Sequence, residues 1–317
     1  TFYQAMDAAQ HLVTLDPVAV ELVDDTMIEL ARSIPIFQPT VEEAVRGNPA
    51  ALLLVEFAEE DMAENERRLR QLHEMMGDLG FGWDKGTARR GGVVDAIGPG
   101  VQGRIAEWRK SGLNIMMSEK SEAKPVSFLE DCAVELKDLA EYTDKLTAIF
   151  DRNGVKGTWY AHASVGCLHV RPVLNMKQAC GAETMRAIAE EAFELVRFFG
   201  GSHSGEHGDG IVRSEFNDRM FGPVLPDLFR QVKAMFDSQG MFNPGKITDA
   251  PKMDERELFR FAPGYEAEDF DSVLDWAAWP GAAGGFQGAV EMCNNNGACR
   301  KLTGGVMCPS YRATRNE

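Results

Sequence analysis

The sequence has few basic residues for its size. It contains 33 lysines and arginines against 49 aspartates and glutamates, which gives a formal net charge of −16 over 317 residues. A surface of this sign repels phosphate backbones and anionic lipid, so nucleic-acid binding and membrane-surface attachment are poor hypotheses. An anionic substrate would need a local cationic pocket.

Long apolar runs and cysteines are also scarce. No run approaches the roughly 18–20 apolar residues that span a bilayer, and residues 1–10 lack the basic and apolar regions of a signal peptide. We therefore expect a cytoplasmic protein without a transmembrane segment, and peripheral attachment to the inner membrane stays open. Six cysteines are too few for a disulfide scaffold. Cys132, Cys167 and Cys180 are expected in the core.

Helical and strand patterns alternate along the chain, and 44% of its residues are hydrophobic, which is ample for a core. The order predicts an α+β domain with a mainly antiparallel sheet covered by helices. The expected helices cover residues 17–32, 61–80, a stretch that ends near 153–154, and 182–199, and the expected strands cover residues 51–58, a segment that starts at 125, and two strands within 155–172.

Residues 160–171 predict a hairpin with polar side chains on one face. With Val165 and Gly166 as the two loop residues, His162 faces His169 and Tyr160 faces Arg171. Side chains alternate between the two faces of a strand, so the other face is small and apolar. Two imidazoles on facing positions could bind one divalent metal, although a hydrogen-bonded surface pair gives the same pattern.

A glycine-rich loop follows the last predicted helix. The segment 200–210 (GGSHSGEHGDG) disfavours helix and strand and lets the backbone approach a ligand. It presents Glu206 as a metal ligand and His207 as a base whose unperturbed pKa is close to neutrality. A soluble glycine-rich turn without a function is the alternative.

Three motifs together resemble a known family. The segments YAHASVGCLHVRP, SGEHGDGIVRSEF and FNPGKI, in this order, are similar to the C-terminal domain of FAD-linked oxidases of the D-lactate and D-2-hydroxyglutarate dehydrogenase group. The resemblance covers residues 1–250. It implies a ferredoxin-like cap domain over the flavin of an FAD domain that is missing from this chain, with the substrate held between the two.

The resemblance also implies roles for particular residues. His162, His169 and Glu206 would bind a divalent metal, zinc or manganese, and His207 would be the catalytic base. The family usually has Gly-Asp-Gly-Asn in the hairpin, where this chain has residues 164–167 (SVGC). The metal's identity is therefore not fixed by the resemblance.

Cationic residues outside these motifs are candidates for binding the substrate. Arg109 lies in a segment similar to the family's Arg-Lys-Ala-Gly-Leu, whose arginine holds the substrate carboxylate, and a guanidinium suits that task because it forms two parallel hydrogen bonds. Lys124 and Arg171 are additional candidates. Asn243 and Lys246, in the FNPGKI motif, are candidates for the flavin side of the site. A basic residue near a helix end also stabilises the helix dipole, so the position of Arg109 has a purely structural explanation too.

The C-terminal part has a different composition. Residues 251–290 predict a linker, and residues 291–317 resemble the truncated start of a ferredoxin-type iron–sulfur domain, with Cys293, Cys299 and Cys308 as ligands. A 4Fe-4S cluster needs four cysteines, so the complete domain would belong to the longer parent protein.

These expectations combine into a substrate-binding fragment of an FAD-dependent dehydrogenase, inactive alone, that oxidises a D-2-hydroxy acid of the D-lactate, D-2-hydroxyglutarate or glycolate type. Its partners would be the small acid and the missing FAD and iron–sulfur domains, and a homo-oligomer stays open. A metal-dependent hydrolase and a non-catalytic electron-transfer or docking module are the alternatives.

Overall fold

The computed structural model describes the chain except residues 85, 88, 269–271, 280–284, 303–308 and 317. The chain forms two compact units. The first consists of residues 1–119 and 123–265, and the second of residues 120–122 and 266–317. The first unit contains the main sheet and all of the candidate site residues except the three C-terminal cysteines.

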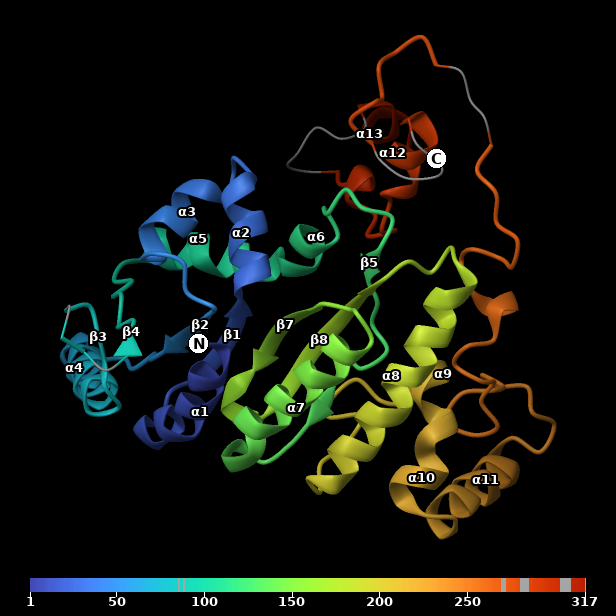
Figure 1. Ribbon diagram of the computed structural model, residues 1–317, viewed down its shortest axis with the longest axis horizontal. Coiled ribbons are helices and arrows are strands. Elements are labelled where there is room, and N and C mark those ends of the chain that lie inside the picture. Colours follow the sequence, from blue (N-terminus) through green and yellow to red (C-terminus); the bar gives the residue numbers. More distant parts are fainter. Residues whose placement is uncertain (85, 88, 269–271, 280–284, 303–308, 317) are drawn as a thin grey trace. The chain divides into compact units, whose positions relative to one another are not determined.

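The main sheet is antiparallel throughout (Figure 1). Its strand order is β2-β1-β7-β8-β5, and β6 pairs with β8 as well. This arrangement confirms the predicted α+β class with an antiparallel sheet. The strands are β1 (Ala19–Asp24), β2 (Ala51–Glu56), β5 (Lys124–Pro125), β6 (Cys132–Ala133), β7 (Gly157–His162) and β8 (Cys167–Leu174), and a separate parallel pair is formed by β3 (Phe81–Gly82) and β4 (Arg89–Arg90).

Helices α1 (Phe2–Leu12), α7 (Leu139–Arg152) and α8 (Ala179–Phe198) cover one face of this sheet (Figure 1). The strands present Leu22, Leu168 and Val170 to them, all buried in the same hydrophobic core. Alternate residues of β7 and β8 therefore anchor the hairpin on the helices and direct the intervening polar side chains to the opposite face.

A second hydrophobic core lies on that opposite face, over β1 and β2. It contains Val23 of β1, together with side chains from α2 (Asp25–Ser33), α3 (Gln38–Ala44), α5 (Pro99–Lys110) and α6 (Gly112–Met116). This core includes Trp108, so it fixes the end of α5 among these helices and β1. Arg109 follows Trp108 directly and is thereby held near the polar face of the hairpin.

The remaining elements are short, apart from two longer helices. They are α4 (Met62–Asp78), α9 (Gly210–Arg213), α10 (Asn217–Phe221), α11 (Val224–Phe236), α12 (Gly285–Glu291), α13 (Pro309–Thr314) and the 3₁₀ turns Val13–Leu15, Leu136–Asp138, Ala163–Val165, Ser214–Phe216, Arg256–Leu258 and Ala298–Arg300. Within the described part of the chain, no helix is both long and apolar enough to cross a bilayer.

The prediction of one helix over residues 17–32 is wrong. Residues 19–24 form β1, because the alternation Val20, Leu22 against Glu21, Val23 has the period of a strand, and the helix starts only at Asp25. The expected strand from residue 125 is also interrupted. Two short strands, β5 and β6, flank a break.

The predicted hairpin register is shifted by two residues. His162 pairs with Cys167, Tyr160 pairs with His169, and Thr158 pairs with Arg171. The reason is a longer turn, since residues 163–165 form a 3₁₀ turn before Gly166 takes a left-handed conformation with φ 67°. A shift of two leaves each side chain on its predicted face.

Asp24 links the sheet to the second core. One carboxylate oxygen accepts a hydrogen bond from Met27 N (2.9 Å) at the start of α2, and the other accepts one from Trp159 N of β7 (2.8 Å). Burial raises the pKa of Asp24 to about 7. Asp24 therefore fixes α2 to the strand that carries His162.

Replacing Asp24 with alanine leaves two buried backbone donors without their acceptor. We expect Asp24→Ala to lower the free energy of unfolding by about 1–3 kcal/mol, measured by urea denaturation. Glu29→Ala, at an exposed position of the same helix, is the control and should change it by less than about 0.5 kcal/mol. Equal stability of the two variants would show that the Asp24 contacts are not stabilising.

Candidate functional site

The candidate site starts from the polar face of the β7–β8 hairpin. Tyr160, His162, Cys167, His169 and Arg171 project from this face, since they pair across the two strands in the observed register. The side chain of His169 is 3% exposed, whereas that of His162 is 31% exposed and lies toward solvent. The hairpin therefore supplies one deep imidazole and one accessible imidazole.

The glycine-rich loop is held against this face by Asp131. The buried carboxylate of Asp131 accepts hydrogen bonds from the backbone N–H groups of Glu206 and His207, both at 2.8 Å, and from the Ser204 hydroxyl at 2.9 Å. Burial alone would raise the pKa of Asp131, but these donors outweigh it and lower the pKa below its ordinary value. Asp131 remains ionised and fixes the loop.

Gly205 allows the loop to come this close. A Cβ atom there would lie 3.0 Å from Cys167 Sγ and 3.1 Å from Ala133 Cβ. A larger residue would push the loop away from β6 and β8, and Glu206 and His207 would move with it.

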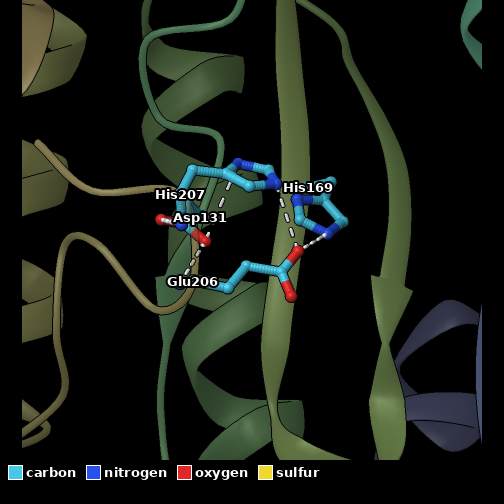
Figure 2. Close-up of side chains that lie close together, drawn as sticks. All are labelled: Asp131, His169, Glu206 and His207. Carbon is cyan, nitrogen blue, oxygen red and sulfur yellow. Dashed lines mark hydrogen bonds and ion pairs between the residues drawn. The ribbon is translucent and has the colours of Figure 1, made fainter. Parts of the chain in front are cut away.

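The three imidazoles and the glutamate meet at one point. Oε1 of Glu206 lies 3.0 Å from His169 Nε2, 3.1 Å from His207 Nε2 and 3.3 Å from His162 Nε2. Figure 2 shows His207 and His169 pointing toward the Glu206 carboxylate, and dashed lines join Asp131 to His207 and Glu206. Residues 162, 169, 206 and 207, predicted from two separate motifs, are thus brought together.

The environments of two imidazoles differ. Burial lowers the pKa of His169, which favours the neutral ring, and one nitrogen of a neutral ring has a lone pair that can bind a metal. The hydrogen bond from His162 Nδ1 to Glu21, together with the charge of Glu21, raises the pKa of His162. The two rings that reach the same carboxylate oxygen therefore have pKa values shifted in opposite directions.

This arrangement fits a metal ion. Two ligands about 2.1 Å from one zinc at a tetrahedral angle lie about 3.4 Å apart, close to the measured N···O distances. Asp131 is also near, in a group with His169, Glu206 and His207 whose ligand atoms lie within 4.8 Å of one another. Its two oxygens, however, already accept the backbone hydrogen bonds of the loop. Asp131 therefore positions the loop, and the predicted ligands His162, His169 and Glu206 stay the candidates for holding the ion.

Arg109 lies at the edge of the same site, in the last turn of α5. Its Nη2 is 2.6 Å from Oε1 of Glu21, and the guanidinium side chain is 45% exposed. Glu21 lies on β1 directly opposite His162. Although Arg109 is paired with Glu21, it is exposed enough for its other donors to reach an anion.

Arg171 is in a buried ion pair. It donates to both oxygens of Glu130, from Nε at 3.0 Å and from Nη2 at 2.7 Å, and to the Tyr160 hydroxyl at 3.1 Å. The ring of Tyr160 packs 4.8 Å from that of His169, centre to centre, and burial raises the pKa of Tyr160 to about 12. The predicted contact between Arg171 and a substrate stays a prediction; in the structure this residue supports the ring next to His169.

The other predicted residues lie farther out. Lys124 pairs with Leu174 on β8, five residues from His169, which corresponds to about 16 Å along a strand. Asn243 and Lys246 are exposed, on a turn whose Ile247 N–H contacts Ser214 Oγ at 3.2 Å. This turn is therefore close to the end of the glycine-rich loop.

Two of the three predicted iron–sulfur ligands lie in the second unit. Cys293 and Cys299 are exposed there, and Cys308 is outside the described residues. Of the cysteines expected in the core, Cys132 and Cys167 are buried, whereas Cys180 is exposed at the start of α8, so its prediction was wrong.

Sequence reasoning missed Glu21, Glu130 and Asp131. The last two are adjacent acids between Leu129 and Cys132, an unusual place for two charges in an apolar segment. Glu21 could have been found from the alternation of residues 19–24, had that segment been identified as a strand.

Removing the Asp131 carboxylate should loosen the loop. Without this acceptor, the N–H groups of Glu206 and His207 lose their partners, so we expect Asp131→Ala to speed amide hydrogen exchange in residues 204–208 by tenfold or more, about 1.4 kcal/mol of local stability. Asp138→Ala, outside the loop, is the control. Unchanged exchange in Asp131→Ala would mean that other contacts hold the loop.

Comparison with known proteins shows the family of this chain. The model for FAD linked oxidases, C-terminal domain, matches residues 1–247. The D-2-hydroxyglutarate dehydrogenase of Pantoea ananatis (strain AJ13355) is 31% identical over 99% of this chain and 30% of its own length. That of Escherichia coli (strain K12) is 32% identical over 100% of this chain and 30% of its own.

The chain therefore spans about 30% of the length of these relatives. Among solved structures, p-cresol methylhydroxylase with substrate bound is similar over 77% of this chain and 50% of its own, with a TM-score of 0.47 and 13% identity. The family model matches more than three quarters of the sequence, including the hairpin and the glycine-rich loop. The chain belongs to the family of FAD linked oxidases and contains their C-terminal domain.

Proposed function

We propose that this chain is the substrate-binding part of an FAD-linked dehydrogenase that oxidises a D-2-hydroxy acid. The observation that carries this proposal is the convergence of three imidazole nitrogens on Oε1 of Glu206, on a sheet face next to Arg109. Relatives that match nearly the whole chain are named D-2-hydroxyglutarate dehydrogenase, which makes this acid the first substrate to test.

A divalent metal would be held by His162, His169 and Glu206. Two imidazoles and a carboxylate are a donor set that suits zinc, and manganese is the alternative. The metal would supply a Lewis acid that lowers the pKa of the substrate hydroxyl. His169 Nδ1 is buried without a hydrogen-bond partner, so its ring is held by packing against Tyr160.

Arg109 is the residue proposed to bind the substrate carboxylate. Its guanidinium is exposed beside the metal residues, and one of its amino groups is occupied by Glu21. The remaining donors provide an edge for a carboxylate. Lys124 and Arg171 remain proposals for further contacts, and their positions favour Arg109 over both of them.

His207 is the proposed base for the hydroxyl proton. Its side chain is 44% exposed, and its Nε2 lies 3.1 Å from Glu206, at the same point where the hairpin imidazoles meet. The backbone of His207 is fixed by Asp131, so the ring is offered from a rigid loop. FAD, when bound, would supply the acceptor for the hydride from C2 of the substrate.

The flavin-binding part is proposed to belong to a longer polypeptide. The chain spans about 30% of its relatives' length, and the site residues Glu206 and His207 are open to solvent. Helix α11 has exposed apolar side chains that another domain could cover, among them Val224, Val232, Met235 and Phe236. Asn243 and Lys246, on the turn after α11, are proposed to lie toward the flavin.

Electron transfer to iron–sulfur clusters is the last step of the proposed function. Cys293 and Cys299 are exposed in the second unit and would be joined by Cys308, but a 4Fe-4S cluster needs a fourth ligand from the longer protein. Membership in a family of flavin oxidases favours this redox chemistry over a metal-dependent hydrolase or a docking module.

The chain should bind zinc at this site. We expect His169→Ala to lower the affinity for Zn²⁺ by about 100-fold or more, because a ligand is lost, as measured by isothermal titration of the purified chain. His73→Ala, an exposed histidine on α4, is the matched control and should bind like the unaltered protein. Equal affinities in all three proteins would remove the metal from the proposal.

His207 can be tested in the full-length protein. We expect His207→Gln to slow flavin reduction by D-2-hydroxyglutarate by about 10²–10⁴-fold in stopped-flow measurements, since the base is lost. His73→Ala should leave the rate unchanged. Undiminished flavin reduction in His207→Gln would contradict the role of His207, and no reduction by any D-2-hydroxy acid in the unaltered protein would contradict the proposed activity.

A further inference from the structure

Glu21 is the one carboxylate, among the described residues, that contacts both Arg109 and a candidate metal ligand. Its Oε2 lies 2.9 Å from His162 Nδ1, and its Oε1 lies 2.6 Å from Arg109 Nη2. The side chain is only 15% exposed, because it projects from β1 between β7 and the end of α5. A single anion is therefore shared between an imidazole and a guanidinium.

The contact with His162 determines which nitrogen of the ring is free. A carboxylate is an acceptor only, so Nδ1 of His162 donates and carries the hydrogen. The lone pair of a neutral ring then lies on Nε2, the atom that points to Glu206 at 3.3 Å. Carboxylates in this position orient metal-binding imidazoles and strengthen them as ligands.

The contact of Glu21 with Arg109 competes with its contact with His162, because both depend on the negative charge of the same carboxylate. While Arg109 is bound to Glu21, part of the carboxylate's charge is compensated, and its attraction for the His162 N–H is weaker. A substrate carboxylate that binds Arg109 would neutralise the guanidinium and return the charge of Glu21 to His162. Nε2 of His162 would then become a better metal ligand.

We propose that Glu21 is a positioning residue that couples carboxylate binding at Arg109 to metal binding at His162. This inference rests on the proposed function, since it requires both sites. Binding of a carboxylate tightens the metal, and by thermodynamic reciprocity the metal tightens the carboxylate by the same factor. The complete site then assembles only when an acid of the right kind is present.

The probe is Zn²⁺, titrated into the purified chain with and without saturating glutarate, a dicarboxylate that has no 2-hydroxyl group. In the unaltered chain we expect glutarate to raise the Zn²⁺ affinity by about fivefold or more. Glu21→Gln should lower the affinity without glutarate by about 10–100-fold and should lose the glutarate effect. Glu56→Gln, the same change at an exposed position on β2, should behave like the unaltered chain.

Glutarate could also touch the metal directly, and Glu21→Gln separates the two effects. An effect of glutarate that persists undiminished in Glu21→Gln would overturn the coupling. If Glu21→Gln fails to fold, Glu21→Asp keeps the charge but withdraws it from His162, and the same loss of affinity is expected.

In the unaltered chain, the ¹⁵N chemical shifts of His162 should report a protonated Nδ1, and the opposite tautomer would also overturn the inference.

Failure of the proposed function gives a different result. Without a metal site, the unaltered chain binds no Zn²⁺ and His169→Ala changes nothing. If only the role of Glu21 is wrong, the unaltered chain binds Zn²⁺, His169→Ala weakens binding, and Glu21→Gln binds as tightly as Glu56→Gln.

Discussion

The carboxylate of Asp131 is the constraint on which the candidate site depends. It lies at the break between β5 and β6, in a left-handed conformation with φ 100°, and accepts the backbone N–H groups of Glu206 and His207. A loop with this many glycines has little conformational preference of its own. The buried carboxylate of Asp131 therefore fixes the loop, as the hydrogen bonds of the sheet fix the hairpin. The loop and the hairpin both supply side chains to the site around Glu206.

The two faces of the main sheet have different roles: one packs into the main core, and the other bears the candidate site residues. Toward α1, α7 and α8 it presents the main hydrophobic core, and the hairpin residues there, such as Leu168 and Val170, are fully buried. On the opposite face the second core covers β1 and β2, while β7 and β8 bear the histidines. Glu21 lies where these two regions meet, so its contacts connect the packed half of this face with the reactive half.

The faces of the hairpin strands could be predicted from the sequence, because the alternation of side chains along a strand is a local property. Strand alternation has a period of two, so the polar face of the hairpin was correct although its register was wrong by two residues. The register depends on the length of the turn, which a sequence does not state. The same limit applies to contacts between distant segments: Asp131 and Glu206 are 75 residues apart, and Glu21 and His162 are 141 residues apart. Local patterns identify the residues of each segment but not their partners.

The net negative charge of the chain affects how an anionic substrate would bind at this site. A protein with a net charge of −16 repels an anionic substrate over most of its surface. Next to this site, Arg109 is a permanent cation whose side chain is 45% exposed, and Glu21 binds one of its amino groups. An acid that reaches this point meets the only described cluster of three histidines in the chain. A small acid would therefore be held here by direct contacts, with the guanidinium of Arg109 and with the proposed metal, and these contacts must outweigh the repulsion of the surrounding surface.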